Sequence, residues 1–214
     1  MHTQSINQNS STLIRSIKGF TILELMITVV VMALVLAIGA PSFIDFIADQ
    51  RIRVAASDFM GDISFARAEA LKTSRRVIMA HATVAGACGA QGPIGNSWNQ
   101  GWCIYVDNDG SGTFTGGDQV LKIHNGFSSG RVLICAKDGS GTAIADFANT
   151  IVFRPDGRVV RNLATVGGSD GFTISDDMGD GRNLNDKIRT IMIGATGRPA
   201  LVIQNGQTNG GTAC

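Results

Sequence analysis

The chain has 214 residues, a formal net charge of +1, 27 glycines and 4 cysteines. Its length allows one globular domain with a core of its own after a long apolar N-terminal segment. The near-neutral charge gives no electrostatic reason to expect nucleic acid or an anionic surface as the main partner.

Residues 1–19 are polar and contain no acidic residue, so we interpret them as a disposable leader. Residues 20–41 form a long apolar run in which Glu24 is the one acid. The eleven Leu, Ile, Val and Met residues between Leu25 and Ala40 gain roughly 0.3 to 0.6 kcal/mol each on entering a membrane. Together they outweigh the roughly 2.5 to 3.5 kcal/mol that one acid costs at a helix centre. We therefore expect residues 20–41 to span a membrane as a helix, with Glu24 retained for a function.

An ordinary secretory signal peptide is the competing interpretation of this run. Such a peptide has an apolar core of about 7 to 15 residues and a small-residue cleavage site, for which Ala37-Ile38-Gly39 would serve. The run is longer than that core, and Glu24 would then have no purpose. The two interpretations predict different mature N-termini, at Phe20 or near Ala40.

Residues 42–73 continue the helix with an amphipathic pattern. Apolar residues recur at a spacing near 3.6, which is typical of a helix that packs one face on a domain. The residues that we assign to the packed face are Phe43, Ile47, Val54, Phe59, Ile63, Ala66 and Ala70. The charged residues between them are interpreted as a solvated face: Asp45, Asp49, Arg51, Arg53, Asp58, Asp62 and Arg67.

From residue 74 onward the apolar pattern changes to a period of two, which predicts strands. Asp-Gly and Asn-Gly pairs between the runs are typical of tight turns. The predicted strands are 77–84, 102–106, 120–123, 131–135, 150–154, 158–161, 172–175, 188–193 and 200–204. We expect residues 74–214 to form an antiparallel meander packed against the helix, which makes the chain an α+β protein.

Four cysteines, Cys88, Cys103, Cys135 and Cys214, fit two disulfides in a compartment outside the cytoplasm. We favour Cys88 with Cys103, which staples the loop before the strand at Trp102. Cys135 with Cys214 would then tie the end of the chain to a strand. Free buried thiols are the alternative.

No pattern in the chain indicates catalysis. His2 lies in the leader, and His81 and His124 lie on separate predicted strands. No nucleophile motif, HExxH or CxxC occurs. We therefore assign no catalytic residue, no cofactor and no enzyme activity.

One loop has the spacing of a calcium site. Oxygen-bearing side chains occupy EF-hand positions 1, 3, 5, 7, 9 and 12, namely Asp107, Asp109, Ser111, Thr113, Thr115 and Asp118. Asp118 is shorter than the usual glutamate, and the flanking residues predict strands. We favour a polar hairpin turn and assign no metal.

The N-terminal residues resemble the type IV prepilin signature, GFTxxEL preceded by a basic residue, here Lys18. Gly19 matches the residue before the prepilin peptidase cut, and Phe20 matches the first mature residue, which that family N-methylates. Glu24 matches the fifth mature residue, which the family requires for assembly, and Pro41 matches a helix-kinking proline. The resemblance implies that the Phe20 amine of one subunit pairs with the Glu24 carboxylate of a neighbour in an apolar stack.

Two internal strings resemble the GspH/FimT group, which contains minor pilins of type IV pili and the H pseudopilin of type II secretion. Residues 98–107, WNQGWCIYVD, resemble WxxGWxxFxD, and residues 151–158, IVFRPDGR, resemble xFxPxGR. The resemblance implies a type IV pilin fold and a minor pilin or pseudopilin that helps to initiate or cap assembly with other pilins. It implies a single-pass protein of the bacterial inner membrane with residues 74–214 in the periplasm, later near the tip of a pilus or pseudopilus.

DNA binding is the alternative function. Some FimT-type minor pilins are DNA receptors through a GRxR string near the C-terminus. Gly197 and Arg198 match that string, but Ala200 replaces the second arginine. Phosphate binding needs several clustered cations, and nearby acids offset those present here. We favour a hairpin turn at Gly197 and Arg198.

Overall fold

The computed structural model describes residues 19–82, 86–88, 98–127, 130–137, 147–160, 171–176 and 188–203, without the side chains of 38–42. Apart from Gly19, the predicted leader lies outside the described residues. The chain divides into two compact units, one that ends at Ile44 and one that begins at Asp45.

One helix, α1, extends from Ile22 to Thr73 and belongs to both units. It begins where Thr21 accepts the backbone N–H of Glu24 on its hydroxyl at 3.2 Å, which satisfies one of the free donors of the first turn. It ends before Ser74, whose φ of 52° is a left-handed conformation that the helix cannot continue. The predicted boundaries, residues 20 and 73, agree with this helix to within two residues.

In the first unit, α1 carries the apolar run that was predicted to span a membrane. Within the part of the chain that the structure describes, no helix has the length and apolarity needed to cross a membrane. The predicted span, residues 20–41, includes positions 38–41, whose side chains lie outside the description.

In the second unit, one face of α1 is buried along its length. The buried residues on this face include Ile52, Ala55, Phe59, Ile63, Ala66 and Ala70. The assignment of Val54 to the packed face was wrong, because its side chain is 56% exposed. Phe43, which was assigned to the same face, belongs to the first unit and is 63% exposed. Val54 and Phe59 are five residues apart, which is about 140° around a helix, so the two side chains cannot share a face.

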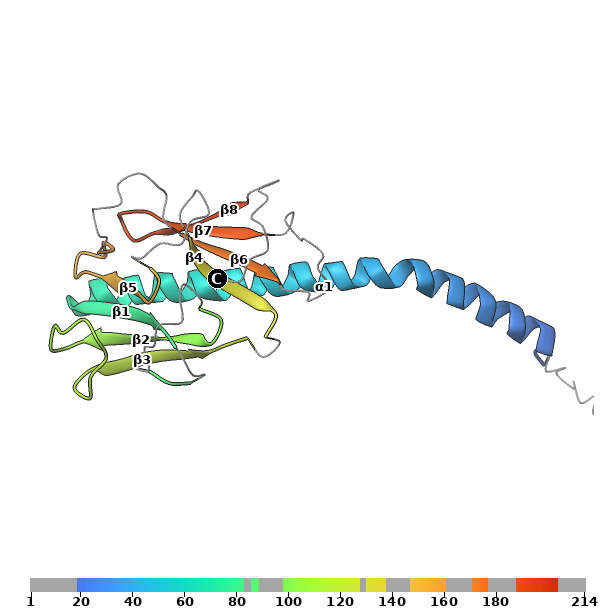
Figure 1. Ribbon diagram of the computed structural model, residues 1–214, viewed down its shortest axis with the longest axis horizontal. Helices are drawn as coiled ribbons and strands as arrows, with labels where there is room; N and C mark the ends of the chain where they lie inside the picture. Colours follow the sequence, from blue (N-terminus) through green and yellow to red (C-terminus); the bar gives the residue numbers. More distant parts are fainter. Residues whose placement is uncertain are drawn as a thin grey trace, which may run out of the picture. The chain divides into compact units, whose positions relative to one another are not determined.

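Eight described strands follow the helix. They are β1 (Arg76–His81), β2 (Gly101–Asp107), β3 (Gln119–Asn125), β4 (Val132–Lys137), β5 (Thr150–Phe153), β6 (Gly171–Asp176), β7 (Arg189–Ile193) and β8 (Pro199–Ile203). They form two four-stranded sheets, in the orders β3-β2-β1-β5 and β4-β6-β7-β8 (Figure 1). Every pair of neighbouring strands is antiparallel.

The connections differ from the single meander that the alternating pattern predicted. The chain leaves the first sheet after β3, forms β4 of the second sheet, and then returns to place β5 beside β1. The predicted strand at residues 158–161 is also wrong. In its described part, one isolated bridge forms between Val159 and Phe153. An alternating pattern marks which residues face the core, but it does not specify which strand is the partner.

Phe59 lies at the centre of the core and contacts both sheets. Its ring centroid is 4.9 Å from that of Trp102 on β2 and 4.8 Å from that of Phe172 on β6. Trp98 approaches edge-on at 5.7 Å. Edge-to-face pairs of this kind add about 0.5 to 1.5 kcal/mol each to the burial of the rings. The prediction that both tryptophans are structural aromatics is confirmed, since both are fully buried.

Candidate functional site

The first unit presents an extended apolar surface in its described part. Every large apolar side chain from Phe20 to Leu36 is at least 55% exposed. These positions are largely consecutive and therefore surround the helix instead of forming one stripe. An exposed apolar surface of this extent marks a segment that is buried elsewhere, in a membrane or against other proteins.

Glu24 lies in the first turn of this helix and is exposed. Thr21 and Glu24 occupy the N-cap and N3 positions, which is the spacing of a capping box. The positive end of the helix dipole stabilises a carboxylate there. Among the described residues, none donates a hydrogen bond to the Glu24 carboxylate or forms an ion pair with it. The acid is therefore available to a group outside the chain, and Thr21 gains a capping role that the prepilin motif does not indicate.

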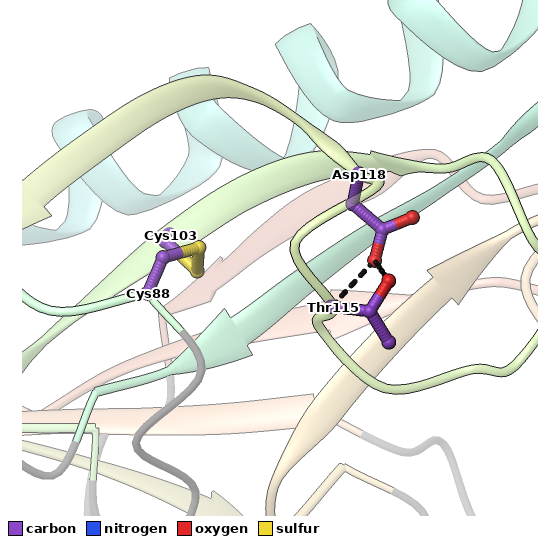
Figure 2. Close-up of a disulfide and its surroundings, with 4 residues drawn as sticks. All are labelled: Cys88, Cys103, Thr115 and Asp118. Carbon is purple, nitrogen blue, oxygen red and sulfur yellow. Dashed lines mark hydrogen bonds between the residues drawn. A yellow bond between two sulfur atoms is a disulfide. The ribbon is translucent and has the colours of Figure 1, made fainter.

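Cys88 and Cys103 form a disulfide with their Cα atoms 5.5 Å apart, and this is the pair expected from the sequence (Figure 2). Cys103 belongs to a small apolar cluster with Tyr105, separate from the main core. Cys135 is also disulfide-bonded. Cys214 lies outside the described residues, so the pairing of Cys135 with Cys214 stays a prediction.

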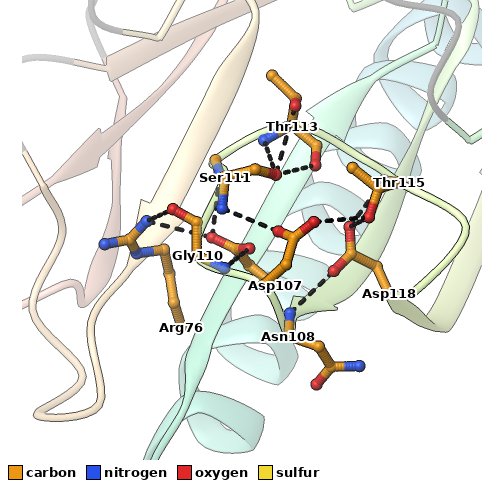
Figure 3. Close-up of polar contacts among 10 residues, drawn as sticks. Arg76, Asp107, Asn108, Gly110, Ser111, Thr113, Thr115 and Asp118 are labelled. Carbon is orange, nitrogen blue, oxygen red and sulfur yellow. Dashed lines mark hydrogen bonds and ion pairs between the residues drawn. The ribbon is translucent and has the colours of Figure 1, made fainter.

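The loop between β2 and β3 gathers three carboxylates (Figure 3). One oxygen from each of Asp107, Asp109 and Asp118 lies within 4.8 Å of the others. Asp107 is buried, and its two oxygens accept the N–H groups of Gly110 and Gly112 at 2.8 and 3.2 Å. The loop backbone thus satisfies both oxygens of its most buried acid.

The other two acids are held by donors of the same loop. Asp118 accepts the N–H groups of Asn108 and Thr115, each at 2.8 Å. Asp109 accepts the N–H of Ser111 and the hydroxyl of Thr115, each at 2.9 Å. These hydrogen bonds, with the Ser111 backbone first, lower the pKa of Asp109 to about 2.

This geometry favours the interpretation of the loop as a hairpin turn rather than as a calcium site. In an EF-hand the carboxylates point at the ion between two helices, whereas here they accept hydrogen bonds from the loop and the flanking elements are strands. Arg76 also forms an ion pair with Asp107 at 3.1 Å, which offsets negative charge that a cation would need. The loop places Phe114 on Tyr105, with ring centroids 5.2 Å apart, and so covers the cluster beside the disulfide.

Two glycine turns lie against each other in the β domain. Gly157 and Gly197 have φ values of 73° and 74°, and a Cβ on Gly197 would lie 2.3 Å from the carbonyl oxygen of Gly157. Arg67 of α1 donates from Nε to the carbonyls of Gly157 and Thr196 at 3.2 and 3.0 Å. The turn predicted at Gly197 and Arg198 is present between β7 and β8. Gly157 of the xFxPxGR string and Gly197 of the partial GRxR string therefore allow two backbone turns to pack closely against each other.

A family model described as Type II transport protein GspH matches residues 55–197, which are 143 of the 214 residues. The chain belongs to this family. A second model, the prokaryotic N-terminal methylation motif, matches residues 14–40, the stretch that contains Gly19, Phe20 and Glu24. The family predicted from the sequence is confirmed.

Solved structures similar to this GspH-family chain include two crystal forms of the type IV minor pilin FimU of Pseudomonas aeruginosa (strain PAO1). In space group P21 it is 19% identical, with 72% of this chain and 89% of that chain covered at a TM-score of 0.47. In space group P65 it is 20% identical, with 70% of this chain and 91% of that chain covered at a TM-score of 0.43. A comparison with curated proteins finds no match.

In this GspH-family chain, one acid of the predicted solvated face is buried. Asp62 is 3% exposed, accepts the indole N–H of Trp102 at 2.8 Å and forms an ion pair with Lys122. The prediction that Asp62 is solvated was wrong. A helical period marks apolar side chains, but it does not reveal a donor that approaches from another element. Trp102 of the WxxGW string therefore has a polar role besides its packing.

The two histidines that the structure describes contact other side chains of the β domain. His81 is buried, with Nε2 3.1 Å from the side-chain oxygen of Asn149. His124 stacks on Trp102 with ring centroids 4.0 Å apart. The strand register places both histidines opposite Trp102, one from each side, and not beside a nucleophile. His2 lies outside the described residues.

Proposed function

We propose that this chain is a minor pilin or pseudopilin, a structural subunit that helps to initiate or cap a type IV pilus or a type II secretion pseudopilus. The carrying observation is the exposed apolar helix with Glu24 near its start, attached to a domain of the GspH family. An apolar helix of this kind needs an apolar partner, and the corresponding helices of neighbouring pilins provide one. The proposed role is structural and not catalytic.

Processing is the first part of the proposal. A prepilin peptidase cuts between Gly19 and Phe20, and the new amine of Phe20 is then methylated. The methylation-motif match and the exposure of both residues support this step. In the assembled stack, the Phe20 amine of one subunit pairs with the Glu24 carboxylate of another, because two opposite charges are far less costly together in an apolar environment than apart.

Localisation is the second part. Residues 20–41 anchor the chain in the inner membrane and the residues from 74 onward lie in the periplasm, until the chain joins a filament near its tip. The disulfide between Cys88 and Cys103 supports an oxidising compartment for that domain. The partners are then other pilins through the N-terminal helix, the prepilin peptidase and the membrane.

The variant Glu24→Ala of the full chain tests the proposal in cells. Membrane insertion and the cut after Gly19 should remain, because the substitution removes a charge that is costly in a membrane. Incorporation into filaments should fall, because the Phe20 amine of a neighbour is left unpaired. Asp156→Ala, which removes an exposed acid from a turn of the β domain, is the matched control and should enter filaments like the wild type.

Two measurements decide the outcome. The mass of the N-terminal peptide locates the cut, and the amounts of chain in inner-membrane and sheared-filament fractions measure incorporation. Equal incorporation of Glu24→Ala and wild type would refute the charge pairing. A mature chain that begins near Ala40 would refute the pilin proposal itself.

DNA binding is a second candidate that one observation favours. Because the glycine turns touch, the exposed residues Arg158 and Arg198, which directly follow them, belong to adjoining turns. Asp156, 3.9 Å from Arg158, offsets part of this charge. A DNA gel shift at rising salt, with Arg198→Ala as the variant, tests this candidate. A shift that is lost with salt and with the variant supports it, and the absence of a shift at low salt rejects it.

A further inference from the structure

A hollow of about 550 Å³ opens beside α1 in the second unit, and none of its lining residues belongs to the apolar run at residues 20–41. Asp58, Gly61 and Phe65 line it from α1, and Lys122 and His124 line it from β3. β3 is an edge strand of the first sheet, so no further strand of that sheet covers this side. The hollow is therefore a surface that a partner can reach.

The charges that line the hollow are not balanced. The carboxylate of Asp62, which also lines the hollow, pairs with Lys122 and accepts the indole N–H of Trp102. Asp58, one turn earlier on α1, is exposed and has no hydrogen bond or ion pair with any described residue. Since Lys122 is already paired with Asp62, one negative charge remains at Asp58. The hollow accordingly favours a cation.

Gly61 keeps one side of the hollow open. Glycine is a poorer helix former than alanine, so a glycine inside a long helix lowers its stability. A Cβ at Gly61 would meet no atom within 4 Å, so packing within the chain does not require a glycine there. The missing side chain instead allows another molecule to approach the backbone of α1.

The aromatic side chains that line the hollow indicate which kind of cation fits it. Phe65 is 36% exposed, and His124 is fixed in place by stacking on Trp102. A hollow lined by a carboxylate and by aromatic side chains matches an arginine, because its planar guanidinium pairs with a carboxylate through two parallel hydrogen bonds. The aliphatic part of that side chain packs on apolar surface, which Phe65 provides.

We propose that this hollow binds an arginine side chain of a neighbouring pilin-type subunit, with the guanidinium on Asp58 and the aliphatic stem on Phe65. The inference rests on the proposed function, because the neighbour is present only if the chain assembles. It adds a contact made by the second unit to the contacts made by the N-terminal helix, and it gives the β domain a means of selecting its neighbour.

A photo-crosslinker tests this contact in cells that make the full chain. Phe65 is replaced by p-benzoylphenylalanine, and adducts are collected from sheared filaments and identified by peptide mass. The test variants are Asp58→Asn, Asp58→Lys and Gly61→Leu, which remove the charge, reverse it or fill the hollow. The matched controls are Asp156→Lys and Ala68→Leu, at exposed positions that do not line the hollow.

We expect an adduct with a pilin-type chain whose crosslinked peptide contains an arginine. Asp58→Lys and Gly61→Leu should each lower its yield at least about tenfold, Asp58→Asn should lower it less, and the controls should leave it unchanged. Thermal unfolding of the full chain in detergent should show no loss of stability for Gly61→Leu, since leucine is a good helix former and nothing lies near the new Cβ.

The outcomes separate this inference from the proposed function. Adducts that persist in Asp58→Lys and Gly61→Leu, or that lack an arginine, overturn the inference. Chain that is present in filaments without any adduct at position 65 also overturns it and leaves the proposed function intact. Chain that is absent from filaments altogether overturns the proposed function.

Discussion

Trp102 donates its indole N–H to the buried carboxylate of Asp62 at 2.8 Å, and this bond joins β2 to α1. Lys122 of β3 pairs with the same carboxylate, so two neighbouring strands are attached to the helix through one acid. The contact is polar, whereas the ring of Phe59 one turn away joins the same strand to the helix by packing. The orientation of the first sheet on α1 thus depends on both kinds of contact.

Asp62→Ala should lower the free energy of unfolding by about 1 to 3 kcal/mol, because it leaves the buried indole N–H of Trp102 without an acceptor. Asp62→Asn keeps one acceptor oxygen and should cost less. Asp58→Ala, one turn away and exposed, should change stability by about 0.5 kcal/mol or less. Chemical denaturation of the full chain in detergent measures all three variants. Equal values for Asp62→Ala and Asp58→Ala would mean that the bond contributes nothing.

Gly197→Ala should destabilise the fold for two reasons. The φ of 74° costs an alanine about 1 to 2 kcal/mol, and its Cβ would lie 2.3 Å from the carbonyl oxygen of Gly157. Gly112→Ala is the matched control, because its φ is 78° but nothing lies within 4 Å of a new Cβ. Thermal unfolding should therefore show a larger loss for Gly197→Ala. If both variants lose the same stability, the close approach of the two turns is not significant.

The folded chain should lose stability in acid through Asp109, which lies in the loop between β2 and β3. The pKa of Asp109 is lowered from 3.8 to about 2 in the folded chain, chiefly by the backbone N–H of Ser111. Below pH 4 the unfolded chain therefore binds a proton that the folded chain does not, and stability falls as the pH drops from about 4 to about 2. Carboxyl NMR shifts of Asp109 should give a midpoint near 2. The variant Asp109→Asn should show a shallower loss of stability over this range, and an identical loss would contradict the assignment.

The extent of α1 was predictable because its signals are local. Residues close together in the sequence show all of them: a continuous apolar run, a later period near 3.6 and the end of that period at residue 73. Val54 was misplaced because apolar residues also occur on the exposed face, and spacing alone did not separate the two sets. The T-x-x-E spacing at Thr21 and Glu24 was a further local signal, and it marks the start of the helix.

The arrangement of the strands and the polar contacts of the core were not predictable in this way. The choice of β1 as the partner of β5 depends on surfaces that exist only once the helix and both sheets are packed. The burial of Asp62 depends on Trp102, which is 40 residues away, and the function of Arg67 depends on two turns that are 90 and 129 residues away. Residue type and spacing identified the turns and the pair Cys88 and Cys103, but they did not identify these partners.

The pairing of β5 with β1 has a consequence for the order in which the chain becomes structured. Val77 pairs with Phe153, so the two partners are 76 positions apart in the sequence. If the domain crosses a membrane from its N-terminal side, one edge of β1 stays without its partner until most of the domain has emerged. Long-range pairing of this kind slows folding, and an unpaired strand edge invites association with other chains. We therefore expect the interval before β5 arrives to be the period in which a newly exported chain is most open to aggregation and to proteolysis.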